Sequence, residues 1–153
     1  MPGAPPDLIV RPMLPADLPE TLDVWVAAWQ AAYPAIDFEV RRGWTRDRIA
    51  ELERTGSQSL VVLGDGRILG ALVVNPDTGY LDQLVVATEC QGRGIAEVLM
   101  AEARRLSPAG LDLHVNQDNA RAVRFYEKQG FAITGEDKNP RSGAPVYTMS
   151  WRP

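Results

Sequence analysis

The segment at residues 91–96, Gln-Gly-Arg-Gly-Ile-Ala, restricts the possible fold and function of this chain more than any other feature of its sequence. An apolar, β-branched run ending at Val86 precedes it, and apolar residues at helical spacing follow it as far as Leu106. This order predicts a glycine-rich turn between a strand and a helix. Small residues there let a ligand approach backbone N–H groups, and the unpaired donors and dipole of a helix N-terminus favour an anion. We therefore expect a phosphate or pyrophosphate site, although glycines at this spacing also occur in turns that serve packing alone.

Two other phosphate-binding motifs do not fit the turn. A P-loop requires Gly-Lys-Ser/Thr after a longer loop, and the chain has no such run. A dinucleotide-binding fingerprint requires a small residue three positions after Gly94, where Glu97 stands instead. That fingerprint also belongs on the first strand of a βαβ unit. Both interpretations are excluded.

Length and composition limit the class of protein. A chain of 153 residues with 45% hydrophobic content can bury a sizeable core, so we expect one domain over residues 1–153, with residues 1–7 disordered. A single cysteine, Cys90, and a single histidine, His114, exclude a disulfide framework and argue against a metal site. The net charge of −4 argues against nucleic acid. Because no apolar run reaches membrane-spanning length and the start lacks a secretion signal, we expect a cytoplasmic protein without a membrane partner.

Periodicity along the chain predicts an α/β (α+β) fold. We expect strands at 8–11, 59–63, 68–74, 80–86, 111–115, 133 and 146–151, and helices at 15–33, 45–54, 94–106 and 120–129. Residues 135–145 are expected to form a polar loop. The helix between the strands at 80–86 and 111–115 makes those two strands parallel. The expected architecture is one mixed, mostly antiparallel central sheet flanked by helices.

Two blocks of sequence share a pattern with a known family. The first is Leu-Asp-Gln-Leu-Val-Val at residues 81–86, followed by Gln91, Gly94 and Ala96. The second is Leu-Asp-Leu-His-Val at residues 111–115, followed by Asn119-Ala120 and by Phe-Tyr-Glu-Lys-Gln-Gly-Phe at 125–131. Together they resemble the GNAT superfamily of N-acetyltransferases, which carry Gln/Arg-x-x-Gly-x-Gly/Ala at this turn. The likeness covers essentially the whole chain and implies a GNAT-like fold, in which one parallel pair of strands is splayed at the cofactor site.

The resemblance implies direct transfer of the acetyl group of acetyl-CoA to a primary amine of a small molecule or peptide. The backbone of residues 91–96 would hold the pyrophosphate, and the strand edge at 84–86 would bond to the pantetheine arm as an added strand does. Asn119 would contact the same arm. The residues implied to bind acetyl-CoA are Leu84, Val85, Val86, Gln91, Gly92, Arg93, Gly94, Ile95, Ala96, Asn119 and Tyr126.

The proton on the acceptor amine has three candidate destinations. An amine with a pKa of about 10.4 is almost fully protonated at pH 7, so a base is useful. Asp82 lies on the strand before the turn, where several relatives place a carboxylate, and His114 lies where some carry a glutamate. Water is the third option. Strict alternation puts Asp82 on the face of Leu84 and Val86, unless a β-bulge re-aims it.

Two further groups are expected to act on the thioester. The backbone N–H of Val86 is the expected donor to the carbonyl oxygen. Tyr126 matches the tyrosine of the family that serves the leaving thiolate. A phenol with a pKa of about 10 is a weaker acid than a thiol with a pKa of about 8.5. We therefore expect Tyr126 to donate a hydrogen bond to the thiolate, with full proton transfer only if the site lowers the pKa of the phenol.

The acceptor pocket is the part that the sequence specifies least. Tyr33, at the end of the first helix, and Trp44 are the candidate acceptor-binding residues. The arginines at positions 41, 42, 46 and 48 form either a solvated face or a basic rim that favours a carboxylate-bearing substrate. Two alternative functions stay open, namely a catalytically silent acyl-CoA sensor and a transferase for another acyl group. A homodimer would be common for chains that resemble this one.

Overall fold

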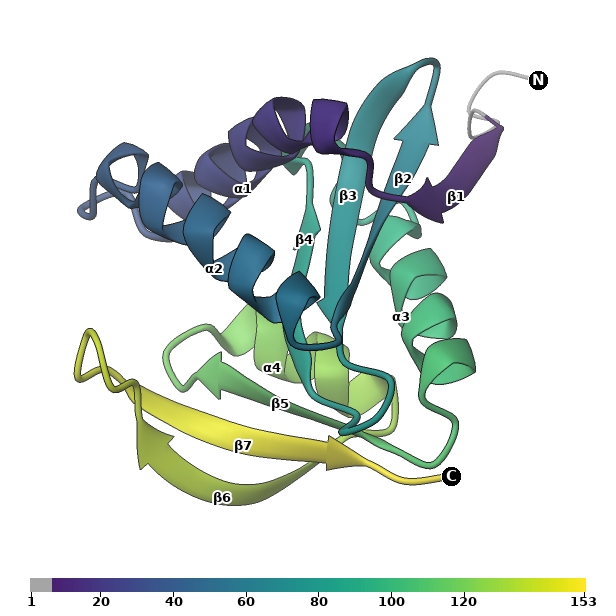
Figure 1. Cartoon of the computed structure of the whole chain (residues 1–153). Coiled ribbons are helices and arrows are strands. Elements are labelled where there is room, and N and C mark those ends of the chain that lie inside the picture. The colour runs from purple at the N-terminus through teal and green to yellow at the C-terminus, as the bar shows by residue number, and fades with distance from the viewer. Residues whose placement is uncertain (1–6) are drawn as a thin grey trace.

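The computed structural model describes residues 7–153, so most of the segment expected to be disordered lies outside the described residues. Within that range the chain forms seven strands and four α-helices (Figure 1). The strands are β1 (Leu8–Pro12), β2 (Gln58–Gly64), β3 (Arg67–Val74), β4 (Leu81–Val86), β5 (Leu111–Asn116), β6 (Ala132–Lys138) and β7 (Pro145–Trp151). The helices are α1 (Leu18–Ala32), α2 (Arg42–Arg54), α3 (Ile95–Leu106) and α4 (Ala120–Lys128). Single 3-10 turns lie at Pro15–Asp17, Glu39–Arg41 and Thr88–Cys90.

The order of elements agrees with the sequence periodicity, with one clear error near the C-terminus. Residues 135–138 were expected to belong to a polar loop, but β6 continues to Lys138, which pairs with Pro145 of β7. The loop is therefore only residues 139–144. The error has a physical cause, since β6 is an edge strand whose residues are almost all exposed. Without a buried face, no alternation of apolar residues marks it as a strand.

The expected single sheet is two sheets, with strand orders β1-β2-β3-β4 and β5-β7-β6. The parallel strands β4 and β5 are the facing edges of these sheets, and they meet at one bridge between Tyr80 and Asp112. Just before that bridge, a Cβ atom on Gly79 would lie 2.5 Å from the carbonyl oxygen of Gly110, so only glycine allows this close approach. Beyond the bridge the two strands separate, which confirms the splayed parallel pair that the resemblance implied (Figure 1).

Helices cover both faces of the four-stranded sheet (Figure 1). On one face, α1 and α2 bury Leu22 and Ile49 against Val73 of β3. On the other face, α3 packs so closely that a Cβ atom at Gly70 of β3 would lie 3.1 Å from Leu99. That second face carries the main core, which continues into the three-stranded sheet. Within the described residues, no helix is both long and apolar enough to span a membrane.

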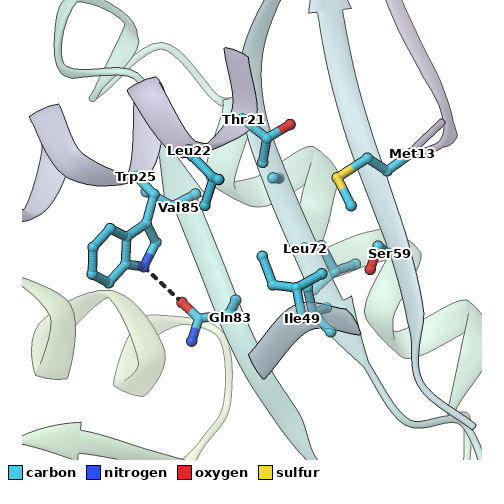
Figure 2. Close-up of a pocket in the computed structure, with 11 residues that line it drawn as sticks. Met13, Thr21, Leu22, Trp25, Ile49, Ser59, Leu72, Gln83 and Val85 are labelled. Atoms are coloured by element: carbon cyan, nitrogen blue, oxygen red, sulfur yellow. Dashed lines mark hydrogen bonds between the residues drawn. The ribbon is translucent and has the colours of Figure 1, made fainter. Parts of the chain in front are cut away.

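A small apolar cavity of about 10 Å³ lies under α1 and α2 (Figure 2). One water molecule would fill such a space, so it is a packing defect rather than a ligand site. Beside it, the indole Nε1 of Trp25 donates to the side-chain oxygen of Gln83 at 3.1 Å, which fastens α1 to β4.

Candidate functional site

Unpaired backbone groups of β4 face the gap between the two sheets. The N–H of Ala87 donates to the carbonyl of Leu69 at 2.8 Å, and Val86 is paired in register with Gly70. In an antiparallel ladder, alternate residues exchange hydrogen bonds with the neighbouring strand. The N–H and C=O groups of Leu84 and Val86 therefore point away from β3, toward β5. Such an edge can receive an extended polar chain as it would receive another strand.

A cavity of about 590 Å³ lies against this edge of β4, on the side of α4. That volume is typical of small-molecule sites. Its walls come from α1, from β4 with the turn after it and the start of α3, and from α4 with the loop before it. The lining residues are Ala28, Trp29, Ala31, Ala32, Tyr33, Leu84, Val85, Val86, Cys90, Gln91, Gly92, Ala96, Glu97, Asp118, Asn119, Ala120, Arg121, Ala122, Phe125 and Tyr126.

The glycine-rich turn forms one end of the cavity. Gly92 and Gly94 have φ angles of 82° and 87°, which L-residues with side chains rarely adopt. A Cβ atom at either position would meet nothing within 4 Å. Packing therefore does not explain these glycines, and the space above the turn is open. Gly94 caps α3, whose first N–H groups have no partner within the helix.

Three residues of the turn lie outside the cavity lining. Arg93, Gly94 and Ile95 were expected to contact the cofactor through their backbone N–H groups, and none of the three lines the cavity wall. Ile95 is 4% exposed and packs into the main core. The backbone groups of these residues remain the ones expected to serve an anion.

A cation from α4 that was not predicted from the sequence reaches the turn. Nη1 of Arg121 donates to the side-chain oxygen of Gln91 at 2.8 Å, while the amide of Gln91 donates to the carbonyl of Val86 at 3.4 Å. Arg121 stands two residues after the cap residue Asn119, in the first turn of α4. This position was the feature of the sequence that could have identified it. The cavity wall also carries the carboxylate of Glu97.

Helix α4 presents Asn119 and Tyr126 to the cavity. The Oδ1 of Asn119 accepts from the N–H of Ala122 at 3.2 Å and caps the helix, so its NH₂ group remains available to a ligand. Tyr126 packs edge-on against Phe125, with ring centroids 5.4 Å apart. Burial raises the pKa of Tyr126 to about 12, so at neutral pH its hydroxyl is a hydrogen-bond donor and a very weak acid.

Tyr33 connects α1 to the loop after β5 across the cavity wall. Its hydroxyl donates to Oδ1 of Asp118 at 2.6 Å and accepts from Nδ2 of Asn116 at 3.1 Å. Burial, followed by the hydrogen bond to Asp118, raises the pKa of Tyr33 to about 12. Its ring stacks on Trp29, which also lines the cavity.

Asp82 is re-aimed by a β-bulge. The register pairs Gln83 with Val73 and Leu81 with Val74, so Asp82 is the extra residue of β4. Its side chain is 5% exposed, and its two oxygens accept from Nε and Nη2 of Arg48 at 3.1 and 2.5 Å. Asp82 does not line the cavity.

His114 lies on the polar face of β5 and is exposed. Its Nδ1 and the hydroxyl of Tyr80 are joined by a hydrogen bond of 2.7 Å. Burial, followed by the charge of Asp82, raises the pKa of Tyr80 to about 12, so the phenol is neutral. His114 lies outside the cavity lining, beside the point where the two sheets meet.

Trp44, the second expected acceptor-binding residue, is also outside the cavity. It lies in the first turn of α2, 38% exposed, with the guanidinium groups of Arg48 and Arg141 over its ring. The candidate site therefore has two parts. One is the cavity beside β4, and the other is a polar side-chain cluster next to the first half of that strand, formed by Asp82, Arg48, Trp44 and Arg141.

Comparison with known proteins bears on this site. Residues 18–131 match the model of the acetyltransferase (GNAT) family. A peptidyl-lysine N-acetyltransferase of Escherichia coli, YiaC, is 28% identical over 146 residues, which cover 94% of this chain and 96% of YiaC. The peptidyl-lysine N-acetyltransferase YjaB of Salmonella typhimurium is 38% identical over 71 residues, 46% of this chain and 48% of YjaB.

The fold is also similar to solved structures. The PaiA N-acetyltransferase of Thermoplasma acidophilum, in complex with coenzyme A, superposes with a TM-score of 0.78 at 17% identity. The match covers 96% of this chain and 99% of that one. At this identity the likeness is one of fold.

Proposed function

This chain belongs to the GNAT family of acetyltransferases, and we propose that it transfers the acetyl group of acetyl-CoA to the ε-amine of peptidyl lysine. The observation that carries the proposal is the cavity between β4 and α4, in a chain whose family match spans both elements. The acceptor class is taken from YiaC, the relative that aligns over nearly the whole chain.

The cavity fits acetyl-CoA. The open space above Gly92 and Gly94 admits a pyrophosphate to the backbone donors at the start of α3, and Arg121 adds a cation beside it. From there the edge offers the N–H groups of Leu84 and Val86 and the carbonyl of Leu84 to the amides of the pantetheine arm, while the carbonyl of Val86 accepts from Gln91. The acetyl thioester of the bound cofactor supplies an electrophilic carbon and a thiolate leaving group.

Two groups of the chain stabilise the negative charge that develops on the carbonyl oxygen and on the sulfur of the thioester. The N–H of Val86 points into the gap and donates to the carbonyl oxygen as it becomes negative. Tyr126 donates a hydrogen bond to the sulfur as the C–S bond breaks. Because its pKa of about 12 lies well above that of a thiol, Tyr126 stabilises the thiolate without giving up its proton.

We assign the base to His114 rather than to Asp82. Both oxygens of Asp82 are occupied by Arg48, whereas only one nitrogen of His114 has a partner among residues 7–153. When Nδ1–H donates to the hydroxyl of Tyr80, the lone pair of Nε2 is free to take the proton of the lysine ammonium group. Asp82 then serves to hold Arg48.

Thiol release from acetyl-CoA, measured over lysine peptides, free amino acids, polyamines and aminoglycosides, tests the proposal. We expect release with lysine peptides and a single acetyl group on the lysine side chain by mass spectrometry. Release only with the other amines would contradict the acceptor class. Tight acetyl-CoA binding without release for any acceptor would contradict the proposed transferase and favour a sensor.

A further inference from the structure

Two guanidinium groups share the ring of Trp44 outside the cavity. The guanidinium carbon of Arg141 lies 3.5 Å from the ring centroid, and that of Arg48 lies 5.6 Å from it. Stacking engages the flat face of a guanidinium group and leaves its in-plane N–H donors for other partners. Arg48 directs Nε and Nη2 to Asp82, which leaves Nη1 without a hydrogen bond among the described residues.

The loop that carries Arg141 is fixed by its own hydrogen bonds. Oδ1 of Asn139 accepts from the N–H groups of Arg141 and Ser142 at 2.9 and 3.2 Å. The N–H of Asn139 donates to the carbonyl of Ala144 at 2.8 Å, at the base of the loop. The loop therefore holds Arg141 over α2 before any ligand binds, which lowers the entropy cost of recognition.

Arg141 also lacks a counter-ion. On α2, Arg42, Arg46 and Arg48 each contact a carboxylate within 4 Å. Within residues 7–153, Arg141 has no carboxylate at that distance. The stacked pair thus carries an uncompensated positive charge in a protein whose net charge is −4.

This cluster lies on the side from which the acceptor must come. A cofactor whose pyrophosphate lies at the turn after β4, and whose arm follows Val86 and Leu84, directs its thioester toward the first half of β4. Asp82, the anchor of Arg48, precedes Leu84 by about 7 Å along the strand. His114, the proposed base, is linked to the same region through Tyr80.

We propose that Arg141, stacked on Trp44 beside Arg48, binds a carboxylate group of the acceptor next to the reacting amine. This inference rests on the proposed function and refines its substrate class. A bidentate guanidinium–carboxylate contact would position the amine at the thioester, and the same charge would disfavour lysines flanked by cationic residues. The carboxylate belongs either to an acidic side chain beside a peptide lysine or to the α-carboxylate of the lysine itself.

Matched acceptors separate these two sources. One pair is a blocked peptide with a central lysine flanked by Glu or by Gln, and the other pair is Nα-acetyl-lysine and its amide. We expect the carboxylate-bearing member of at least one pair to have a KM about tenfold lower, with kcat unchanged. The pair that shows the preference identifies the source. Equal KM values within both pairs would overturn the inference.

Arg141→Gln is the decisive variant. It should remove the preference by raising KM for the carboxylate-bearing acceptor only, and Arg141→Lys should restore part of it because the charge is kept. Arg105→Gln, which changes an exposed arginine of α3, is the matched control and should keep the full preference. A preference that persists in Arg141→Gln would overturn the inference, as would an equal KM increase for both members of a pair.

Binding of the Glu and Gln peptides to the CoA-loaded protein, measured by titration calorimetry, does not depend on turnover. A preference for the Glu peptide that Arg141→Gln abolishes would support the carboxylate site even if no lysine were acetylated, and only the proposed function would then fail. Acetylation of lysine without any charge preference, in turnover and in binding, would leave the proposed function intact and refute the carboxylate site.

Discussion

The sites at the two ends of β4 are formed by different kinds of chemical group. At its C-terminal end, the cavity depends on backbone groups: the open edge at Leu84 and Val86 and the positive-φ glycines of the turn. At its N-terminal end, the polar cluster depends on side chains from separate elements, with Asp82 on a bulge and Arg141 on a loop. A backbone-built site needs a short contiguous sequence, whereas a side-chain-built site needs a whole fold to assemble it. The first is therefore tied to a motif, and the second can change residue by residue.

The largest effect is expected where the backbone itself is changed. Gly92→Val places a β-branched residue at a φ of 82° and adds bulk inside the cavity. Acetyl-CoA affinity should fall by at least about 100-fold, as calorimetry would measure, because strain and steric exclusion add. Gly66→Val is the matched control, with a φ of 75° and equally open surroundings in the β2–β3 turn. Equal affinity in the two variants would show that the turn does not bind the cofactor.

Tyr126→Phe tests the chemical role at the cofactor end. Removing the hydroxyl should lower kcat by about 100-fold, while the Kd for acetyl-CoA stays nearly the same. Steady-state kinetics and calorimetry on the same preparation measure both quantities. Unchanged turnover would mean that another group stabilises the thiolate.

His114→Gln tests the chemical role at the acceptor end. At pH 7 kcat/KM should fall by about tenfold or more, since the variant can acetylate only the small fraction of lysine amine that is already neutral in solution. The deficit should shrink as the pH rises toward 10, where solvent deprotonates lysine without help. Asp82→Asn should keep the pH profile of the unmodified protein. A parallel, pH-independent loss in His114→Gln would refute the role of base.

Arg48→Met probes how the side-chain cluster is held together. It leaves the carboxylate of Asp82, which is 5% exposed, without its charged partner, so that the side-chain amide of Gln83 is its remaining donor among the described residues. We expect a loss of about 2 kcal/mol in the free energy of unfolding, reduced from the value of a fully buried pair because Arg48 is partly exposed. Arg54→Met, which breaks an exposed pair on the same helix, should change stability by less than about 0.5 kcal/mol. Urea unfolding gives both values, and similar losses would argue against a structural role for the pair.

Alkaline unfolding tests the burial of tyrosines at both ends of β4. Tyr33, Tyr80 and Tyr126 have pKa values raised from 10.0 to about 12. Between those values the unfolded chain loses phenolic protons that the folded protein keeps, so stability falls as the pH rises from 10 to 12 and is unaffected below 10. Each tyrosine contributes at most about 1.4 kcal/mol per pH unit. Urea midpoints over this range should fall less steeply for Tyr126→Phe, and a flat profile in the unmodified protein would contradict the burial of these phenols.

The sequence predicted most of the fold, namely the features that depend on interactions between residues close together in the chain. Helical spacing, turn glycines and β-branched runs located every element in order, because each depends on neighbouring residues. The strand β6 was predicted only in part, because an exposed edge strand has no buried face that would mark it in the sequence. The division into two sheets was missed because β4 and β5 are joined by a single bridge, between Tyr80 and Asp112, and how far two such strands pair depends on residues far apart in sequence.

The candidate site divides in the same way. Leu84, Val86, Gly92, Asn119 and Tyr126 lie in contiguous blocks, and the structure brings them to one cavity. Arg121 was missed because the sequence does not state which side of α4 faces the gap. The partners of Asp82 and Trp44 were not predictable, since a bulge and a loop bring Arg48 and Arg141 to them.

The central claim is that the cofactor binds along the open edge of β4. Amide hydrogen exchange, followed residue by residue by NMR with and without acetyl-CoA, tests it most directly. The N–H groups of Leu84 and Val86 should become protected on binding, whereas that of Val85, which already faces Ala71 of β3, should change little. Unchanged exchange at Leu84 and Val86 in the saturated complex would contradict the account.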